Sequence, residues 1–188
     1  AYRCRDSEET RQFYEDFLGL PLAESIEITQ TKSGRRTDVL HTFYQLDDGS
    51  YLAFFDAPDM PFEFKTQHDF DLHIALEVEQ SVLDPMLAKG KAAGIETRGI
   101  SDHGSIQSIY FRDPNGYVIE LTARQPSHAK AMDPKVNGAR AKLERGARIL
   151  DLGAGILQGI NPFPFRRQPF DREESARIAL EAERIETA

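Results

Sequence analysis

The sequence has little cysteine, no long apolar run and a shortage of positive charge, and each absence excludes a class of protein. A single cysteine, Cys4, cannot build a disulfide framework, which is typical of a reducing cytoplasm. No apolar stretch is long enough to cross a bilayer, and no signal-peptide pattern is found. The formal net charge of -8 would repel nucleic acid and anionic membranes over most of the surface. We therefore expect a cytoplasmic protein with a small-molecule ligand and no nucleic-acid or membrane partner.

Length and composition predict one globular domain followed by an extension. The 188 residues are enough for a proper core but marginal for two full domains. Hydrophobic residues at 40% and charged residues at 29% are ordinary for a soluble globular protein. From Pro126 onward, polar, Gly- and Pro-rich and charged stretches follow one another, and such a segment buries little by itself. We predict a domain over residues 1–125 and a partly helical C-terminal extension over 126–188, with helices near 140–152 and 171–185.

One order of elements occurs twice within the predicted domain, in copies of about 1–57 and 71–125. The first copy is expected to contain a strand, a helix and three strands, at residues 1–5, 7–18, 22–28, 39–46 and 51–55. The second copy is expected to contain the same elements at residues 73–78, 81–94, 95–98, 108–112 and 117–122. Turns with Asp and Gly, at 47–50 and 113–116, join the last two strands of each copy. This duplication predicts an α+β fold of two tandem βαβββ modules, which form a curved, cup-shaped mixed sheet.

Two residues that can bind a metal ion open and close the second module. Side chains alternate along a strand, so His73 lies on the face opposite Ile74, and Glu120 lies on the face opposite Ile119 and Leu121. If the apolar faces pack under a helix, the two polar side chains point into a shared concavity. A neutral imidazole and a carboxylate that converge there suit a divalent metal ion.

Each of these two residues also has a structural interpretation. An isolated strand histidine such as His73 is more often an interior residue than a ligand. Glu120 could equally be an exposed glutamate on its strand. Their matching places at the two ends of the module favour the metal site.

Two stretches of the domain have a distinctive order of residues. Arg5-Asp6-Ser7 leads to FYEDFLG at 13–19, and SIYFRDPNGYVIE occupies 108–120. With the duplicated modules, these stretches resemble the vicinal oxygen chelate superfamily. That superfamily contains glyoxalase I, the bleomycin- and fosfomycin-resistance proteins, methylmalonyl-CoA epimerase and the extradiol ring-cleaving dioxygenases. The resemblance covers roughly the first two thirds of the chain, and it is more specific for the fold than for the reaction.

The resemblance implies one metal ligand from the first strand and one from the last strand of each module. His73 and Glu120 match these positions in the second module, whereas Ala53 stands at the position of Glu120 in the first. Extradiol dioxygenases bind Fe(II) through two histidines and one glutamate, so Ala53 is compatible with three ligands and not with the four of glyoxalase I. Aligning Ala75 with Ala1 places the remaining histidine just upstream of Ala1, where we expect it. Without that histidine the triad is incomplete.

Three further residues are candidate catalytic groups. Tyr110 matches the tyrosine near the metal of extradiol enzymes, where a phenol hydrogen-bonds substrate oxygen, but an aromatic strand residue also fills cores. His103 resembles the loop histidine of the superfamily and either shuttles a proton or caps a turn. His41, on a strand of the first module, either lines the same cup or is paired within its sheet.

These residues together favour a metal-dependent enzyme, an Fe(II) extradiol-type dioxygenase that cleaves an aromatic vicinal diol. Mn(II), Zn(II) and Ni(II) are the alternative metals. The alternative activities are a glyoxalase- or epimerase-like reaction, in which the metal stabilises an enediolate, and metal-free ligand binding of the bleomycin-resistance type. A homodimer is the expected assembly.

Overall fold

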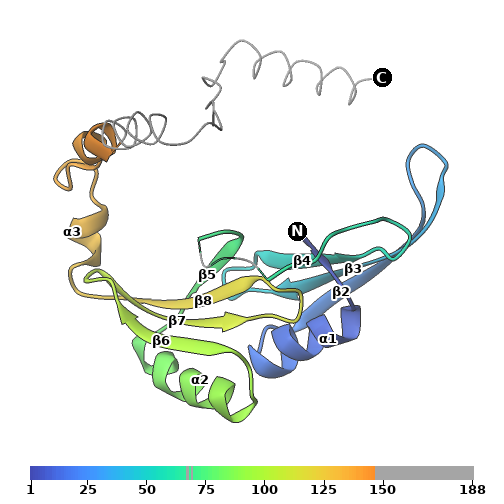
Figure 1. Cartoon of the computed structure of the whole chain (residues 1–188), viewed down its shortest axis with the longest axis horizontal. Coiled ribbons are helices and arrows are strands. Elements are labelled where there is room, and N and C mark those ends of the chain that lie inside the picture. Colours follow the sequence, from blue (N-terminus) through green and yellow to red (C-terminus); the bar gives the residue numbers. More distant parts are fainter. Residues whose placement is uncertain (67, 69, 147–188) are drawn as a thin grey trace, which may run out of the picture. The chain divides into compact units, whose positions relative to one another are not determined.

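Each half of the predicted domain folds as a strand, a helix and three strands (Figure 1). The structure is a computed structural model and describes residues 1–66, 68 and 70–146. Its first compact unit is Ala1–Asp133, and a second unit begins at Pro134. Residues 139–146 are helical, as predicted for that region, whereas the helix predicted at 171–185 lies outside the described residues.

The first module forms one four-stranded sheet. Its elements are β1 (Tyr2–Cys4), α1 (Ser7–Arg11), the π-helical continuation η1 (Gln12–Phe17), β2 (Leu22–Gln30), β3 (Arg36–Gln45) and β4 (Tyr51–Asp56). The strand order is β1-β4-β3-β2, with β1 parallel to β4 and the other pairs antiparallel. Asp6 caps the helix, because its side chain accepts a hydrogen bond from the Glu9 amide at 2.8 Å.

The second module repeats this topology in a sheet of its own. Its elements are β5 (His73–Glu77), α2 (Gln80–Ala92), β6 (Thr97–Asp102), β7 (Ile106–Arg112) and β8 (Val118–Arg124), and the short helix α3 (His128–Met132) follows. The strand order is β5-β8-β7-β6, again with the first pair parallel. The predicted α+β fold of two tandem βαβββ modules is confirmed. In Figure 1 each sheet has its helix on one side, and we call the opposite side its open face.

The two modules share one hydrophobic core. Its fully buried side chains come from the helices and from the helix-facing sides of both sheets, and they include Tyr14, Tyr44, Phe54, Leu83, Ile109, Phe111 and Ile119. Phe17 of the first module meets Phe111 of the second edge to face, with ring centroids 5.1 Å apart. Ile74 and Leu76 pack against this core, so the predicted alternation along the strand at 73–78 is confirmed there.

The turn between β7 and β8 ties the second module to the start of the first. The buried carboxylate of Asp113 accepts hydrogen bonds from the Tyr14 hydroxyl at 2.9 Å and the Tyr117 amide at 2.7 Å. The side chain of Asn115 accepts a hydrogen bond from the Arg5 amide at 2.8 Å. Gly116 has a φ of +94°, and a Cβ there would lie 2.4 Å from the backbone oxygen of Lys65, so only glycine fits. The turn motif is therefore structural, and it fixes where β8 begins.

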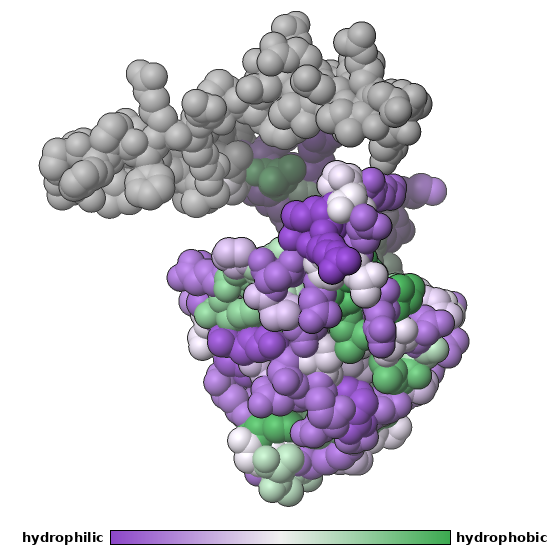
Figure 2. All heavy atoms as spheres, turned by 90° about the vertical axis from the view of Figure 1, so that its right-hand side faces the viewer, coloured by the Kyte–Doolittle hydropathy of each residue, from purple (hydrophilic) through white to green (hydrophobic). Residues whose placement is uncertain are grey.

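The surface visible in Figure 2 is mostly hydrophilic, with its hydrophobic residues in separate patches. Among the helices of the described residues, none combines the length and the apolar character needed to span a bilayer. This agrees with the absence of long apolar runs in the sequence.

Candidate metal centre

His73 and Glu120 meet on the open face of the second sheet. They lie on the neighbouring parallel strands β5 and β8, where His73 pairs with Val118 and Ala75 pairs with Glu120. The Nε2 atom of His73 is 2.5 Å from a carboxylate oxygen of Glu120. Glu120 is only 7% exposed, and 27% of the His73 side chain remains accessible. The sheet therefore brings together the two residues that the sequence singled out.

Because Glu120 is buried, its carboxylate needs a polar partner. Ile119 and Leu121, which flank Glu120 in sequence, point into the core, so the glutamate is directed to the open face by strand alternation. A buried carboxylate is costly unless a charged or hydrogen-bonded partner compensates it. His73 provides that partner, since its Nε2 atom lies within hydrogen-bond distance of the Glu120 carboxylate.

The two side chains are of the types that bind a divalent metal ion, but two ligands are fewer than such an ion needs. Imidazole nitrogen and carboxylate oxygen are ligands of Fe(II), Mn(II) and Zn(II). Among residues 1–66, 68 and 70–146, no group of three His, Cys, Asp or Glu side chains is arranged to hold a metal ion. His73 and Glu120 can thus supply two ligands of a larger set.

Strand register shows what stands at the corresponding positions of the first module. Tyr110 pairs with Glu120 across β7 and β8, and Phe43 pairs with Ala53 across β3 and β4 at the same distance from the turn. Ala53 is therefore the counterpart of Glu120, as the sequence alignment predicted. The parallel pairing of Tyr2 with Phe54 places the counterpart of His73 before Ala1.

Tyr110 and His103 extend the group. The Tyr110 hydroxyl lies 2.9 Å from Nε2 of His103, and its ring meets the His73 ring edge to face at 5.6 Å. Burial, followed by the nearby negative charge of Glu120, raises the pKa of Tyr110 above its usual value. The phenol thus keeps its proton at neutral pH. His103 itself is exposed, so the pair links the buried carboxylate to solvent.

His41 lies on the first sheet, among aromatic side chains. Its ring stacks on Phe55 with centroids 3.6 Å apart and contacts Phe43 at 4.2 Å. Its Nε2 atom is buried and has no hydrogen-bond partner in the part of the chain that the structure describes. Burial lowers the pKa of His41 below its usual value, which keeps the ring neutral at neutral pH. The catalytic role suggested for His41 stays a prediction.

Arg98 was not identified from the sequence. It pairs with Tyr110 across β6 and β7, and its guanidinium carbon lies 4.6 Å from the centre of the Tyr110 ring. The strand predicted at 95–98 ended where β6 continues to Asp102, so its register with β7 was unknown. Extending the predicted strand past residue 98 would have been needed to place Arg98 on this face.

Comparison with known proteins gives matches in family and fold. The model of the Glyoxalase/Bleomycin resistance protein/Dioxygenase superfamily matches residues 1–121. A search of curated proteins found no match.

Three solved structures illustrate the similarity in fold. A glyoxalase/dioxygenase from Nostoc punctiforme is 22% identical, with a TM-score of 0.52 over 66% of this chain and 88% of the other. A glyoxylase/bleomycin resistance protein/dioxygenase domain from Frankia sp. EAN1pec is 15% identical, with a TM-score of 0.53 over 66% and 93%. The fosfomycin resistance protein FosX from Listeria monocytogenes, complexed with Mn(II) and sulfate, is 18% identical, with a TM-score of 0.50 over 69% and 93%. At these identities the likeness concerns the fold alone.

Proposed function

Since the chain belongs to the Glyoxalase/Bleomycin resistance protein/Dioxygenase superfamily, we propose that it is a metal-dependent enzyme of that family, an extradiol-type dioxygenase. The substrate class is an aromatic vicinal diol, and the metal is Fe(II). One observation carries the proposal: the 2.5 Å approach of His73 Nε2 to the Glu120 carboxylate on the open face, beside the Tyr110 ring. Ala53, at the counterpart of Glu120, supports a three-ligand site over a four-ligand one.

His73 and Glu120 would hold the metal ion, and the third ligand comes from outside the described residues. A bound Fe(II) ion supplies Lewis acidity, which lowers the pKa of the diol hydroxyls, and a path for electrons to dioxygen. Glu120 is suited to its role because its low exposure keeps the carboxylate fixed and water-poor. FosX from Listeria monocytogenes was solved with Mn(II), which makes Mn(II) the alternative metal to test.

Tyr110 and His103 would manage a proton next to the ligands. With the Nε2–H tautomer of His103 donating to the Tyr110 oxygen, the phenol proton is directed away from His103 and toward bound substrate. The raised pKa of Tyr110 keeps that proton available for donation to substrate oxygen. The exposed ring of His103 then exchanges protons with solvent.

Metal analysis under anaerobic conditions tests the proposal first. Purified full-length protein is expected to bind one Fe(II) per chain, to consume dioxygen with catechol and to form a yellow ring-cleavage product. His73→Ala and Glu120→Gln are expected to lose the metal, whereas His128→Ala, on α3, keeps it. Full-length protein that is indifferent to Fe(II) and Mn(II) would support metal-free ligand binding instead. Stoichiometric metal without dioxygen uptake would point to a glyoxalase- or epimerase-like reaction.

We also propose a homodimer in solution, which is the commonest assembly of soluble proteins. Light scattering behind size exclusion measures the mass directly. A measured mass equal to that of a single chain would contradict this proposal without affecting the metal site.

A further inference from the structure

Two arginines lie in the same rows of side chains as the candidate ligands. Across the second sheet, Arg98 pairs with Tyr110 and Tyr110 with Glu120. In the adjacent row, Arg112 pairs with Val118 and Val118 with His73. Directly opposed residues share a face, so both arginines stand on the open face with the two ligands.

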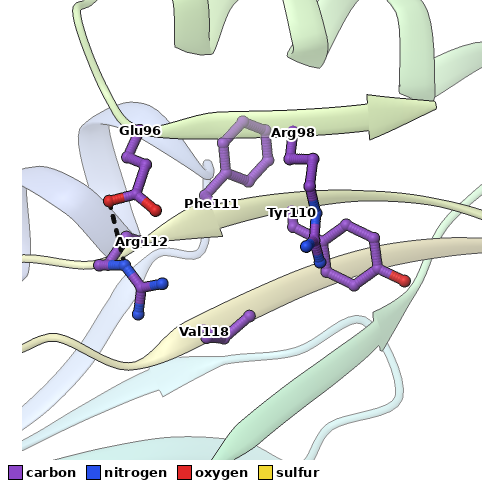
Figure 3. Close-up of a pocket in the computed structure, with 6 residues that line it drawn as sticks. All are labelled: Glu96, Arg98, Tyr110, Phe111, Arg112 and Val118. Carbon is purple, nitrogen blue, oxygen red and sulfur yellow. Dashed lines mark hydrogen bonds and ion pairs between the residues drawn. The ribbon is translucent and has the colours of Figure 1, made fainter. Parts of the chain in front are cut away.

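A small hollow separates the two arginines (Figure 3). Its volume is about 60 Å³, and its lining consists of Glu96, Arg98, Tyr110, Phe111, Arg112 and Val118. In Figure 3 the side chains of Arg98 and Arg112 extend from neighbouring strands toward the space beside Val118. The hollow therefore has an apolar floor, and its walls carry two guanidinium groups and one carboxylate, that of Glu96.

Both guanidinium groups are held in defined orientations. The Arg98 guanidinium stacks over the Tyr110 ring at 4.6 Å. Arg112 donates from Nε to Glu96 at 3.1 Å and from Nη1 to the Gly116 carbonyl at 3.3 Å. Glu96 is largely exposed at the rim, with 70% of its side chain accessible, so its charge is screened more than that of the arginine it contacts. Orientation before binding reduces the entropy that a ligand must overcome.

We propose that this hollow is a subsite for a carboxylate group on the substrate. The inference rests on the proposed function, because it places the charged group one strand away from His73 and Glu120. A guanidinium presents parallel N–H donors that match a carboxylate, and the hollow, at about 60 Å³, has room for such a small group. On a chain of net charge -8, a paired cationic site on the open face selects for an anion locally. The substrate class is thus an aromatic vicinal diol that carries a carboxylate.

Binding of simple probes to the metal-free full-length protein tests the subsite without relying on catalysis. Benzoate and benzamide have nearly the same shape and differ in charge. Calorimetric titration is expected to give at least about tenfold tighter binding of benzoate. Equal binding of the two probes would overturn the proposal.

Substitutions identify the responsible groups. Arg98→Gln and Arg112→Gln are each expected to remove the preference for benzoate, and Arg98→Lys to restore part of it, because lysine keeps the charge but not the paired donors. The matched control is Arg124→Gln, an exposed arginine of the same sheet that pairs with Glu77 outside the hollow. An equal loss in Arg124→Gln would reduce the effect to net charge and refute the subsite. Thermal melting shows whether each variant is folded. If Arg112→Gln is not, the benzoate preference of the two Arg98 variants decides between the outcomes.

Turnover by the Fe(II)-loaded protein separates this inference from the proposed function. Arg98→Gln is expected to raise KM for 3,4-dihydroxybenzoate at least about tenfold more than it raises KM for catechol, which has no carboxylate. Cleavage of both diols with equal KM in the wild type would refute the subsite and leave the dioxygenase proposal intact. Benzoate preference in a protein that binds no metal would leave the subsite intact and refute the dioxygenase proposal.

Discussion

The two modules have the same topology and opposite chemistry on their open faces. On the first sheet, Ala53 and the rings of His41, Phe43 and Phe55 cover the face that corresponds to the candidate site. On the second sheet the equivalent face bears His73, Glu120, Tyr110 and Arg98. The two copies share a backbone pattern, and side-chain identity at a few register positions decides which copy presents the candidate ligands.

The largest expected effect comes from removing a ligand of the second module. His73→Ala deletes one of only two converging donors among the described residues, so metal affinity should fall by at least about 100-fold, and activity with it. Equilibrium dialysis against Fe(II) with metal analysis measures the affinity. Unchanged metal content would contradict the difference drawn between the modules, because His73 of the second sheet would then not be a metal ligand.

The second-largest effect is expected at the turn that joins the modules, and it is an effect on stability. Asp113→Ala leaves the Tyr14 hydroxyl and the Asn115 and Tyr117 amides without their acceptor, at a cost of about 3 kcal/mol in unfolding free energy. Urea unfolding measures it. Two separate transitions in the variant would show that the modules are held together mainly by this turn.

The same residue gives a pH dependence with a defined sign. Burial raises the pKa of Asp113 above its usual value, so the folded protein binds a proton that the unfolded chain has already released. The resulting stability is fully present below the ordinary carboxyl pKa and is lost as the pH rises through the raised folded pKa. Asp113→Asn should abolish this loss, which urea unfolding across the acidic range up to neutrality can detect. An identical profile in both proteins would show that folding does not raise the pKa of Asp113.

Tyr110→Phe tests the proton chemistry of the second face. Removal of the phenol should slow turnover about 100-fold while metal content stays constant, since the hydroxyl contacts His103 and is not itself a ligand here. Steady-state kinetics and metal analysis measure the two quantities separately. If the variant also lost metal, Tyr110 would instead be assigned to positioning the metal ligands.

The smallest effect is expected in the first module. His41→Phe keeps the stacking with Phe43 and Phe55 and removes a buried nitrogen that lacks a partner among the described residues, so stability should rise by about 1 kcal/mol. Thermal melting measures the change. A loss of turnover as large as that expected for Tyr110→Phe would instead assign His41 to catalysis and would make the first face chemically active.

Local patterns predicted what depends on neighbours in sequence. Strand alternation placed His73 and Glu120 on one face, and the 113–116 turn fixed the end of β7, because both follow from short-range geometry. The contact of Tyr110 with His103 and the stacking of Arg98 depend on the register of β6 with β7, which includes a shift between Gly99 and Ser101. Alternation along one strand cannot reveal a register shift against its neighbour.

The turn at 113–116 also sets the order in which the protein can be completed during synthesis. The Arg5 amide and the Tyr14 hydroxyl find their acceptors only on Asn115 and Asp113, about a hundred residues later in the chain. While the ribosome is still producing β6, the helix of the first module therefore lacks both partners and the aromatic contact from Phe111. Contacts of such sequence separation slow folding and favour a single cooperative event late in translation. The duplicated modules are thus expected to fold as one unit, although each has the topology of a complete piece.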